Sequence, residues 1–211
     1  MDSVKQCLSQ LELDKGPDAA FFTDDPIIIV RIKRREVADV HRLLDKGANP
    51  AAIGVEKETL LQLAIEYGME DVSKRLLLLG VDPNEIHASH TPIPLYRAAR
   101  SGNKKLVRLL IENGALVDAL SYASETPLMS ASEAGHLEVA KELIDAGAGI
   151  NKSSASGWTP LIHAGMGGHV TIAEVLLKNG ANPDTKDCDG YNTTDWARKK
   201  HDGMVAQGFR N

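Results

Sequence analysis

The sequence predicts an all-α repeat solenoid of stacked helical units, and three observations support this prediction. Glycine recurs at steps of 33 or 34 residues, at Gly47, Gly80, Gly114, Gly147 and Gly180. An apolar pair stands just before each of these glycines, as in Leu43-Leu44 and Leu176-Leu177. A column of alanine keeps the same step, at Ala64, Ala98, Ala131, Ala164 and Ala197. A fixed period of this length indicates repeats that bury their apolar faces against one another.

Residues 157–183 show how one unit is encoded. Thr159-Pro160 predicts the start of an inner helix that runs to Gly167, because a threonine hydroxyl caps a helix and proline is tolerated in its first position. A second helix is expected over Thr171–Asn179, where apolar residues recur at helical spacing. Gly180 is expected to end it in the left-handed conformation that glycine adopts without strain.

The sequence motifs of the units resemble those of the ankyrin-repeat family. Thr126-Pro127-Leu128 opens one unit, Gly135-His136-Leu137 follows at the expected offset, and Gly180-Ala181-Asn182-Pro183 closes another. The resemblance covers residues 26–200, as about five repeats and a C-terminal half-repeat cap. It implies helix-turn-helix units joined by β-hairpin-like loops, and a protein partner bound on the concave side.

The flanks and one unit depart from this pattern. Residues 1–25 are expected to be an N-terminal extension with a capping helix, in which Phe21-Phe22 either covers the first repeat or anchors a partner. Residues 201–211 are expected to be a tail. The third unit carries two prolines in Thr91–Leu95 and one extra residue before it, so we expect Pro92 and Pro94 to alter its stacking.

The family often places histidine after Thr-Pro-Leu, where it hydrogen-bonds the loop. Here that hydrogen bonding must be replaced or lost, because the position holds Gln62, Tyr96, Met129, Ile162 and Asp195.

Composition limits the function classes. The net charge of −5 disfavours a nucleic-acid binder, which needs a basic surface. Cys7 and Cys188 lie at opposite ends of the stack, so no internal disulfide is expected. No apolar run reaches the length of a membrane span, and Met1–Gln10 does not resemble a secretory signal. These features favour the cytoplasm, and a nuclear protein would look the same. The chain alone is expected to be a monomer.

Few residues suggest chemistry. No phosphate-binding loop, zinc motif or nucleophile context occurs, so the sequence predicts no enzyme, cofactor or small-molecule substrate. His136 and His169 are expected to be structural. Two alternatives stay open: a metal-binding or enzymatic loop using His87 and His90, and nucleic-acid binding through the basic cluster Arg31–Arg35. The plainer interpretation of that cluster is a solvated helix face.

The leading hypothesis is a non-enzymatic protein-binding module, either an adaptor or a stoichiometric inhibitor. The resemblance places partner contacts on the hairpin tips and the exposed face of the inner helices. Aromatic side chains there are favoured, because they often dominate interfaces. The candidates are Glu58, Glu66, Arg100, Tyr122, Glu125, Glu133, Ala155, Trp158, Met166, Tyr191 and Lys199.

Overall fold

A computed structural model describes residues 25–86 and 93–199, and the chain divides into unit 1 (Met1–Pro94) and unit 2 (Leu95–Asn211). The predictions for the N-terminal extension, for His87 and His90, for Pro92 and for the C-terminal tail fall outside the described residues. The boundary between the units falls in the segment where the sequence carries its extra residue.

The described part of unit 1 contains two helix pairs. α2 and α3 form the first pair and α4 and α5 the second, and like helices of the two pairs pack on each other. Their apolar faces form a core that includes Ile28, Leu43, Leu61 and Leu76, each fully buried. The bounds are α2 (Ile27–Lys33), α3 (Val37–Asp45), α4 (Leu60–Glu66) and α5 (Glu70–Leu78).

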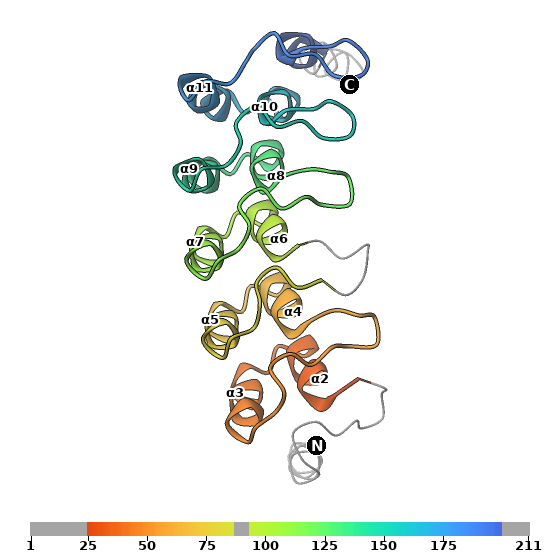
Figure 1. The fold of residues 1–211 in the computed structure, drawn as a ribbon, viewed down its shortest axis with the longest axis vertical. Coiled ribbons are helices and arrows are strands. Elements are labelled where there is room, and N and C mark those ends of the chain that lie inside the picture. The colour runs from red at the N-terminus through yellow and green to blue at the C-terminus, as the bar shows by residue number, and fades with distance from the viewer. Residues whose placement is uncertain (1–24, 87–92, 200–211) are drawn as a thin grey trace, which may run out of the picture. The chain divides into compact units, whose positions relative to one another are not determined.

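Unit 2 repeats this arrangement. Inner helices α6, α8 and α10 lie in one layer and outer helices α7, α9 and α11 in the other (Figure 1). Residues 193–199 form a further helical segment after α11. The predicted all-α solenoid of helix-turn-helix units is confirmed. The bounds are α6 (Pro94–Arg100), α7 (Lys104–Glu112), α8 (Pro127–Ala134), α9 (Leu137–Asp145), α10 (Pro160–Gly167) and α11 (Val170–Lys178).

Local signals act as the sequence predicts. The Thr159 hydroxyl accepts a hydrogen bond from the backbone N–H of Ile162, and Pro160 occupies the first turn of α10. Gly147 and Gly180 follow α9 and α11 with φ of +87° and +90°, the left-handed region that favours glycine. These caps satisfy helix-end groups that would otherwise have no partner.

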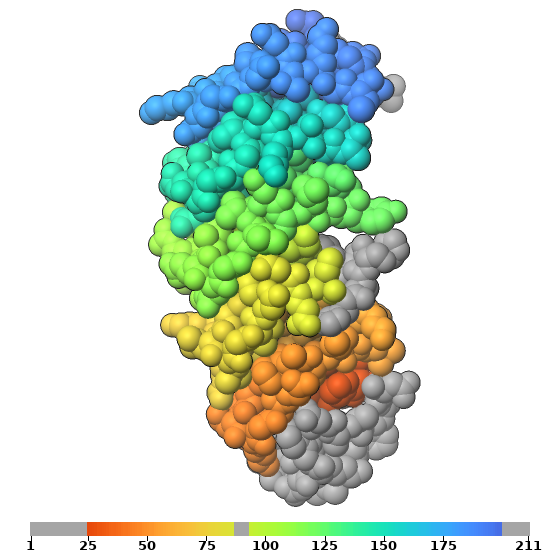
Figure 2. Space-filling model, in the orientation of Figure 1, coloured from red at the N-terminus to blue at the C-terminus, as the bar shows by residue number. Residues whose placement is uncertain are grey.

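Within the described residues, the loops before α4, α8, α10 and residues 193–199 each end in a five-residue turn, which we call a tip. The backbone N–H of residue 54, 121, 154 or 187 donates to the carbonyl four residues later, at 2.9 to 3.0 Å. The fourth residue of each tip has a positive φ and is Lys57, Ser124, Gly157 or Gly190. In Figure 2 the green tip between α7 and α8 projects from the body of unit 2.

The histidine usually expected after Thr-Pro-Leu is replaced in several units. Gln62 accepts from the backbone N–H of Thr59 at 2.8 Å, and Asp195 accepts from that of Asn192 at 3.1 Å. The Met129 sulfur approaches the Thr126 N–H at 3.4 Å. The aliphatic Ile162 has no such group, so this bond is lost there.

The histidines that precede the outer helices link successive repeats. Nε2 of His136 lies 3.1 Å from the carbonyl oxygen of Arg100, and Nε2 of His169 lies 3.0 Å from that of Glu133. The ring of His169 also fills the space beside Gly135, where an added Cβ would lie 2.5 Å from Cε1. The expected structural role of these histidines is confirmed.

The interpretation of the basic cluster as a solvated helix face is wrong for Arg31. Arg31 is 3% exposed and pairs with Glu36 and Asp39. Lys33 pairs with Asp25 at 2.9 Å and also with Glu58. Burial acts to lower the pKa of Lys33, but the two carboxylates outweigh it and hold the pKa above its ordinary value. Both cations are therefore paired with carboxylates within unit 1.

Candidate protein-binding surface

Two predicted contact residues lie in unit 1, in different settings. Glu58 is 8% exposed, and its carboxylate pairs with Lys33 of α2. Glu66 is exposed near the end of α4. The expectation of an accessible Glu58 is wrong, because the ion pair that attaches its tip to α2 removes the carboxylate from solvent.

The other nine predicted residues lie in unit 2, and five of them occupy tips: Tyr122, Glu125, Ala155, Trp158 and Tyr191. Tyr122 is 79% exposed in the tip before α8. Ala155 is exposed in the next tip, and Met166 is half-buried on α10. Tips are closed by backbone hydrogen bonds, so the side chains of Tyr122 and Ala155 are not needed to close the turn.

An acidic cluster lies where α6, α8 and the first tip meet. The Tyr96 hydroxyl donates to Oε2 of Glu125 at 2.6 Å. Burial raises the pKa of Tyr96, and the neighbouring Glu125 carboxylate adds to this effect. Arg100 and Glu133 are exposed beside this pair, with 3.9 Å between their charged groups. Three predicted contact residues are therefore brought together.

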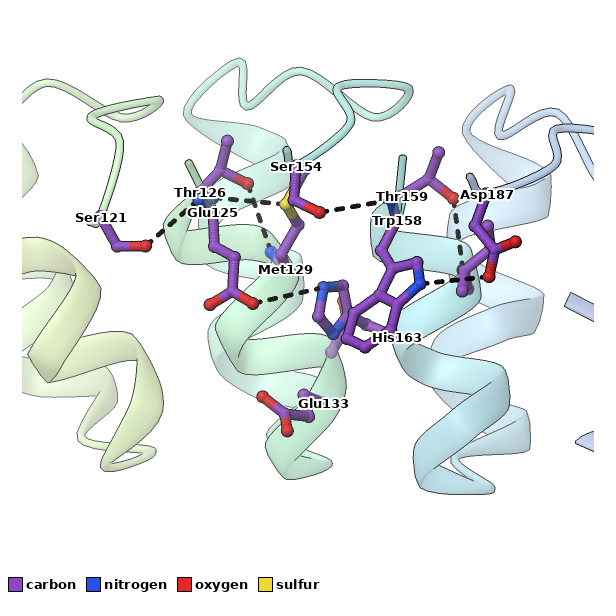
Figure 3. A network of polar contacts seen from close by, with 12 residues as sticks. Ser121, Glu125, Thr126, Met129, Glu133, Ser154, Trp158, Thr159, His163 and Asp187 are labelled. Carbon is purple, nitrogen blue, oxygen red and sulfur yellow. Dashed lines mark hydrogen bonds and ion pairs between the residues drawn. The ribbon is translucent and has the colours of Figure 1, made fainter. Parts of the chain in front are cut away.

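His163 of α10 continues this cluster below the surface (Figure 3). Its ring is 1% exposed, and among the described residues neither ring nitrogen has a hydrogen-bond partner. Nε2 lies 3.9 Å from Oε1 of Glu125, which is too long for a hydrogen bond. Burial lowers the pKa of His163, although Glu125 and Glu133 act in the opposite direction.

An aromatic cluster adjoins the histidine. The Trp158 ring meets His163 edge to face, with ring centroids 5.5 Å apart, and lies 6.0 Å from the Trp196 ring. Both indole N–H groups donate to the same oxygen of Asp187, at 3.1 Å from Trp158 and 2.7 Å from Trp196. Figure 3 shows Trp158 pointing from its tip toward Asp187. Trp158 thus combines packing with partial exposure.

The aromatic cluster ends at Tyr191 and Lys199. The Tyr191 ring lies 5.7 Å from that of Trp196. The Lys199 ammonium sits 3.3 Å from the centroid of Tyr191 and 4.7 Å from that of Trp196. A cation over an aromatic face is attracted by the ring quadrupole.

The side chains of the acidic and aromatic clusters are linked by these contacts, and together with Tyr122 they make up a region of unit 2 that we call the tip-side strip. Sequence reasoning placed Arg100, Tyr122, Glu125, Glu133, Trp158, Tyr191 and Lys199 on it, and missed four residues that hold these in place. A strip that mixes aromatic rings with charges of both signs can bind another protein. The missed residues are Tyr96, His163, Asp187 and Trp196.

The strip does not suggest other chemistry. Within residues 25–86 and 93–199, no three His, Cys, Asp or Glu side chains are grouped to hold a metal ion. The Cys188 thiol is free and exposed, and Cys7 lies outside the described residues. In the same ranges no helix has both the length and the apolar character needed to cross a membrane.

Comparison with known proteins agrees with this architecture. A family model described as ankyrin repeats (3 copies) matches residues 28–121, 73–154 and 95–187. The glycerophosphocholine phosphodiesterase gde1 of Schizosaccharomyces pombe is 30% identical over 87 residues, 41% of this chain and 8% of that protein. A putative ankyrin repeat protein of Fowlpox virus, FPV222, is 33% identical over 92 residues, 43% of this chain and 12% of that protein. The chain therefore spans a small fraction of both relatives.

Proposed function

Because the chain belongs to the ankyrin-repeat family, whose repeats generally mediate protein–protein interaction, we propose that it is a non-enzymatic module that binds a partner protein through the tip-side strip. The partner would lie along the tips and inner helices of unit 2. The chain would act as an adaptor, or as an inhibitor that covers its partner stoichiometrically.

The observation that carries this proposal is the exposure of Tyr122. Its side chain is 79% exposed on the projecting tip before α8. An aromatic side chain this exposed leaves most of its surface accessible to a partner, and tyrosine is enriched among residues that dominate binding. Exposed Arg100 and Glu133 give the neighbouring surface a polar, charged character, as expected around an interface.

Partner capture followed by one matched pair of variants tests the proposal. Proteins retained by the full chain would be identified by mass spectrometry, and their affinities measured for Tyr122→Ala and Val170→Ala. Val170 is also apolar and exposed, at 68%, but it lies on outer helix α11. Tyr122→Ala should weaken binding by about thirtyfold, the equivalent of about 2 kcal/mol. Val170→Ala should leave affinity unchanged.

Unchanged affinity in Tyr122→Ala would contradict the assignment of the strip, provided that the variant melts like the parent chain. A loss confined to Val170→Ala would move the interface to the outer helices. Trp158→Ala is a poor first test, because the indole N–H bond to Asp187 makes loss of binding and loss of structure hard to separate.

A further inference from the structure

The aromatic end of the tip-side strip already holds a cation that belongs to the chain. The Lys199 ammonium lies over the Tyr191 ring at 3.3 Å from its centroid and beside Trp196 at 4.7 Å. The rings of Tyr191 and Trp196 are inclined by 65°, so two ring faces converge on the same region. This geometry shows directly that a lysine ammonium fits against these rings.

Asp187 makes the rings favourable for a positive charge. One of its oxygens accepts from both indole N–H groups, and the other accepts from the backbone N–H groups of Asp189 and Tyr191. The carboxylate is 7% exposed and is held by four N–H donors. Asp187 therefore fixes the positions of the two indole rings and adds negative electrostatic potential near them. An approaching cation would still contact the ring faces before it reached the buried carboxylate.

Lys199 is held weakly enough to be displaced. Within the described part of the chain its ammonium forms no ion pair with a carboxylate, and its side chain is exposed. Cation–π contacts at exposed sites favour the bound form by only about two- to fivefold. A lysine presented by a partner that also contacts the rest of the strip can therefore compete for the same ring faces.

We propose that Tyr191 and Trp196, oriented by Asp187, form a cation site for a lysine side chain of the partner protein, and that Lys199 occupies this site in the free chain. This inference rests on the proposed function, because the rest of the strip must position the partner lysine. Lys199 then has the role of an internal competitor, which must leave when the partner binds.

The chain offers a specific readout, because Trp158 and Trp196 are its two tryptophans and both belong to the aromatic cluster. Their indole N–H signals in ¹H–¹⁵N correlation spectra of the full chain would be followed during titration with N-acetyl-lysine methylamide. The control ligand is the norleucine counterpart, which ends in a methyl group in place of the ammonium. A third ligand, the trimethyl-lysine form, keeps the charge but cannot donate hydrogen bonds.

The lysine and trimethyl-lysine compounds should shift the Trp196 indole signal saturably, and the norleucine compound should not. Equal effects of lysine and norleucine would overturn the proposal, because apolar contact alone would then explain binding. Loss of binding with trimethyl-lysine would overturn it too, because hydrogen bonds would then hold the ammonium.

Two matched comparisons test the roles of the residues. Lys199→Met removes the internal ammonium and should tighten lysine binding by about two- to fivefold. Tyr191→Leu removes a ring face and should abolish the shift, whereas Tyr191→Phe should retain it. Unchanged affinity in Lys199→Met or an unchanged shift in Tyr191→Leu would refute the assignment. The dispersion of the remaining amide signals checks the fold of each variant.

These titrations separate the cation site from the proposed function. If lysine fails to bind while Tyr122→Ala still weakens partner binding, the cation site is wrong and the binding surface stands. If lysine binds as described while Tyr122→Ala binds the partner normally, the tip-side strip is wrong as the partner surface, and the inference that a partner lysine displaces Lys199 is overturned.

Discussion

Replacing Asp187 by asparagine tests whether one carboxylate holds the aromatic cluster together. Oδ1 accepts from the backbone N–H groups of Asp189 and Tyr191 at 3.0 and 2.9 Å, and Oδ2 accepts from the indoles of Trp158 and Trp196. Asparagine offers one acceptor oxygen and one NH₂ group. Two of the four donors would therefore face another donor.

The structure allows an estimate of the loss. A buried donor without an acceptor costs about 1–3 kcal/mol, so two half-buried donors should destabilise this end of unit 2 by about 2–4 kcal/mol. Asp184→Asn is the control, because Asp184 is exposed and undergoes the same change of charge. It should change stability by less than about 0.5 kcal/mol.

Urea unfolding followed by tryptophan fluorescence measures the effect where it arises, since both tryptophans are donors to Asp187. Burial acts to raise the pKa of Asp187, but the four N–H donors outweigh it and hold the pKa below its ordinary value of 3.8. The stabilisation is therefore present above pH 3.8 and lost as pH falls through the lower folded-state pKa. Equal fluorescence midpoints for Asp187→Asn and Asp184→Asn would refute this reasoning.

Two further predictions concern neighbouring features of unit 2. Burial lowers the pKa of His163, so its contribution to stability is present above pH 6.5 and lost as pH falls toward the folded-state pKa. The variant His163→Leu should therefore show a smaller change in melting temperature between about pH 7.5 and 5 than the parent chain. An equal change in both proteins would contradict this prediction. Gly135→Ala should cost about 1 kcal/mol more than Gly147→Ala, because both have positive φ but only at Gly135 would a Cβ meet a histidine ring. Adding His169→Ala to Gly135→Ala should remove that excess in urea unfolding, and strict additivity of the two changes would argue against the clash.

The fold could be predicted because each repeat carries its own local signals. The Thr159 cap and the left-handed Gly147 depend on residues within a few positions, and the apolar columns recur at one period. The resemblance to the ankyrin-repeat family placed candidate contacts on the tips, because tips occupy a fixed place in each unit.

The parts that sequence reasoning missed depend on contacts between repeats. The hydrogen bond between Trp158 and Asp187 joins residues 29 positions apart, and no local pattern marks the aspartate as its acceptor. Arg31 belongs to a charge run typical of a surface, yet it lies near the place of the small alanine in its repeat and is buried by the packing. Glu58 was misplaced for the same reason, because only the folded unit brings Lys33 to it.

In each tip, the groups that form the turn differ from the side chains that a partner protein could contact. Each tip closes through a bond between main-chain groups and a positive φ at its fourth residue, so its second and third residues have little part in forming the turn. Tyr122 and Ala155 stand at the second position of their tips. If a partner binds along the tips, substitutions at this position would change the contact surface one repeat at a time while the main-chain turn is kept.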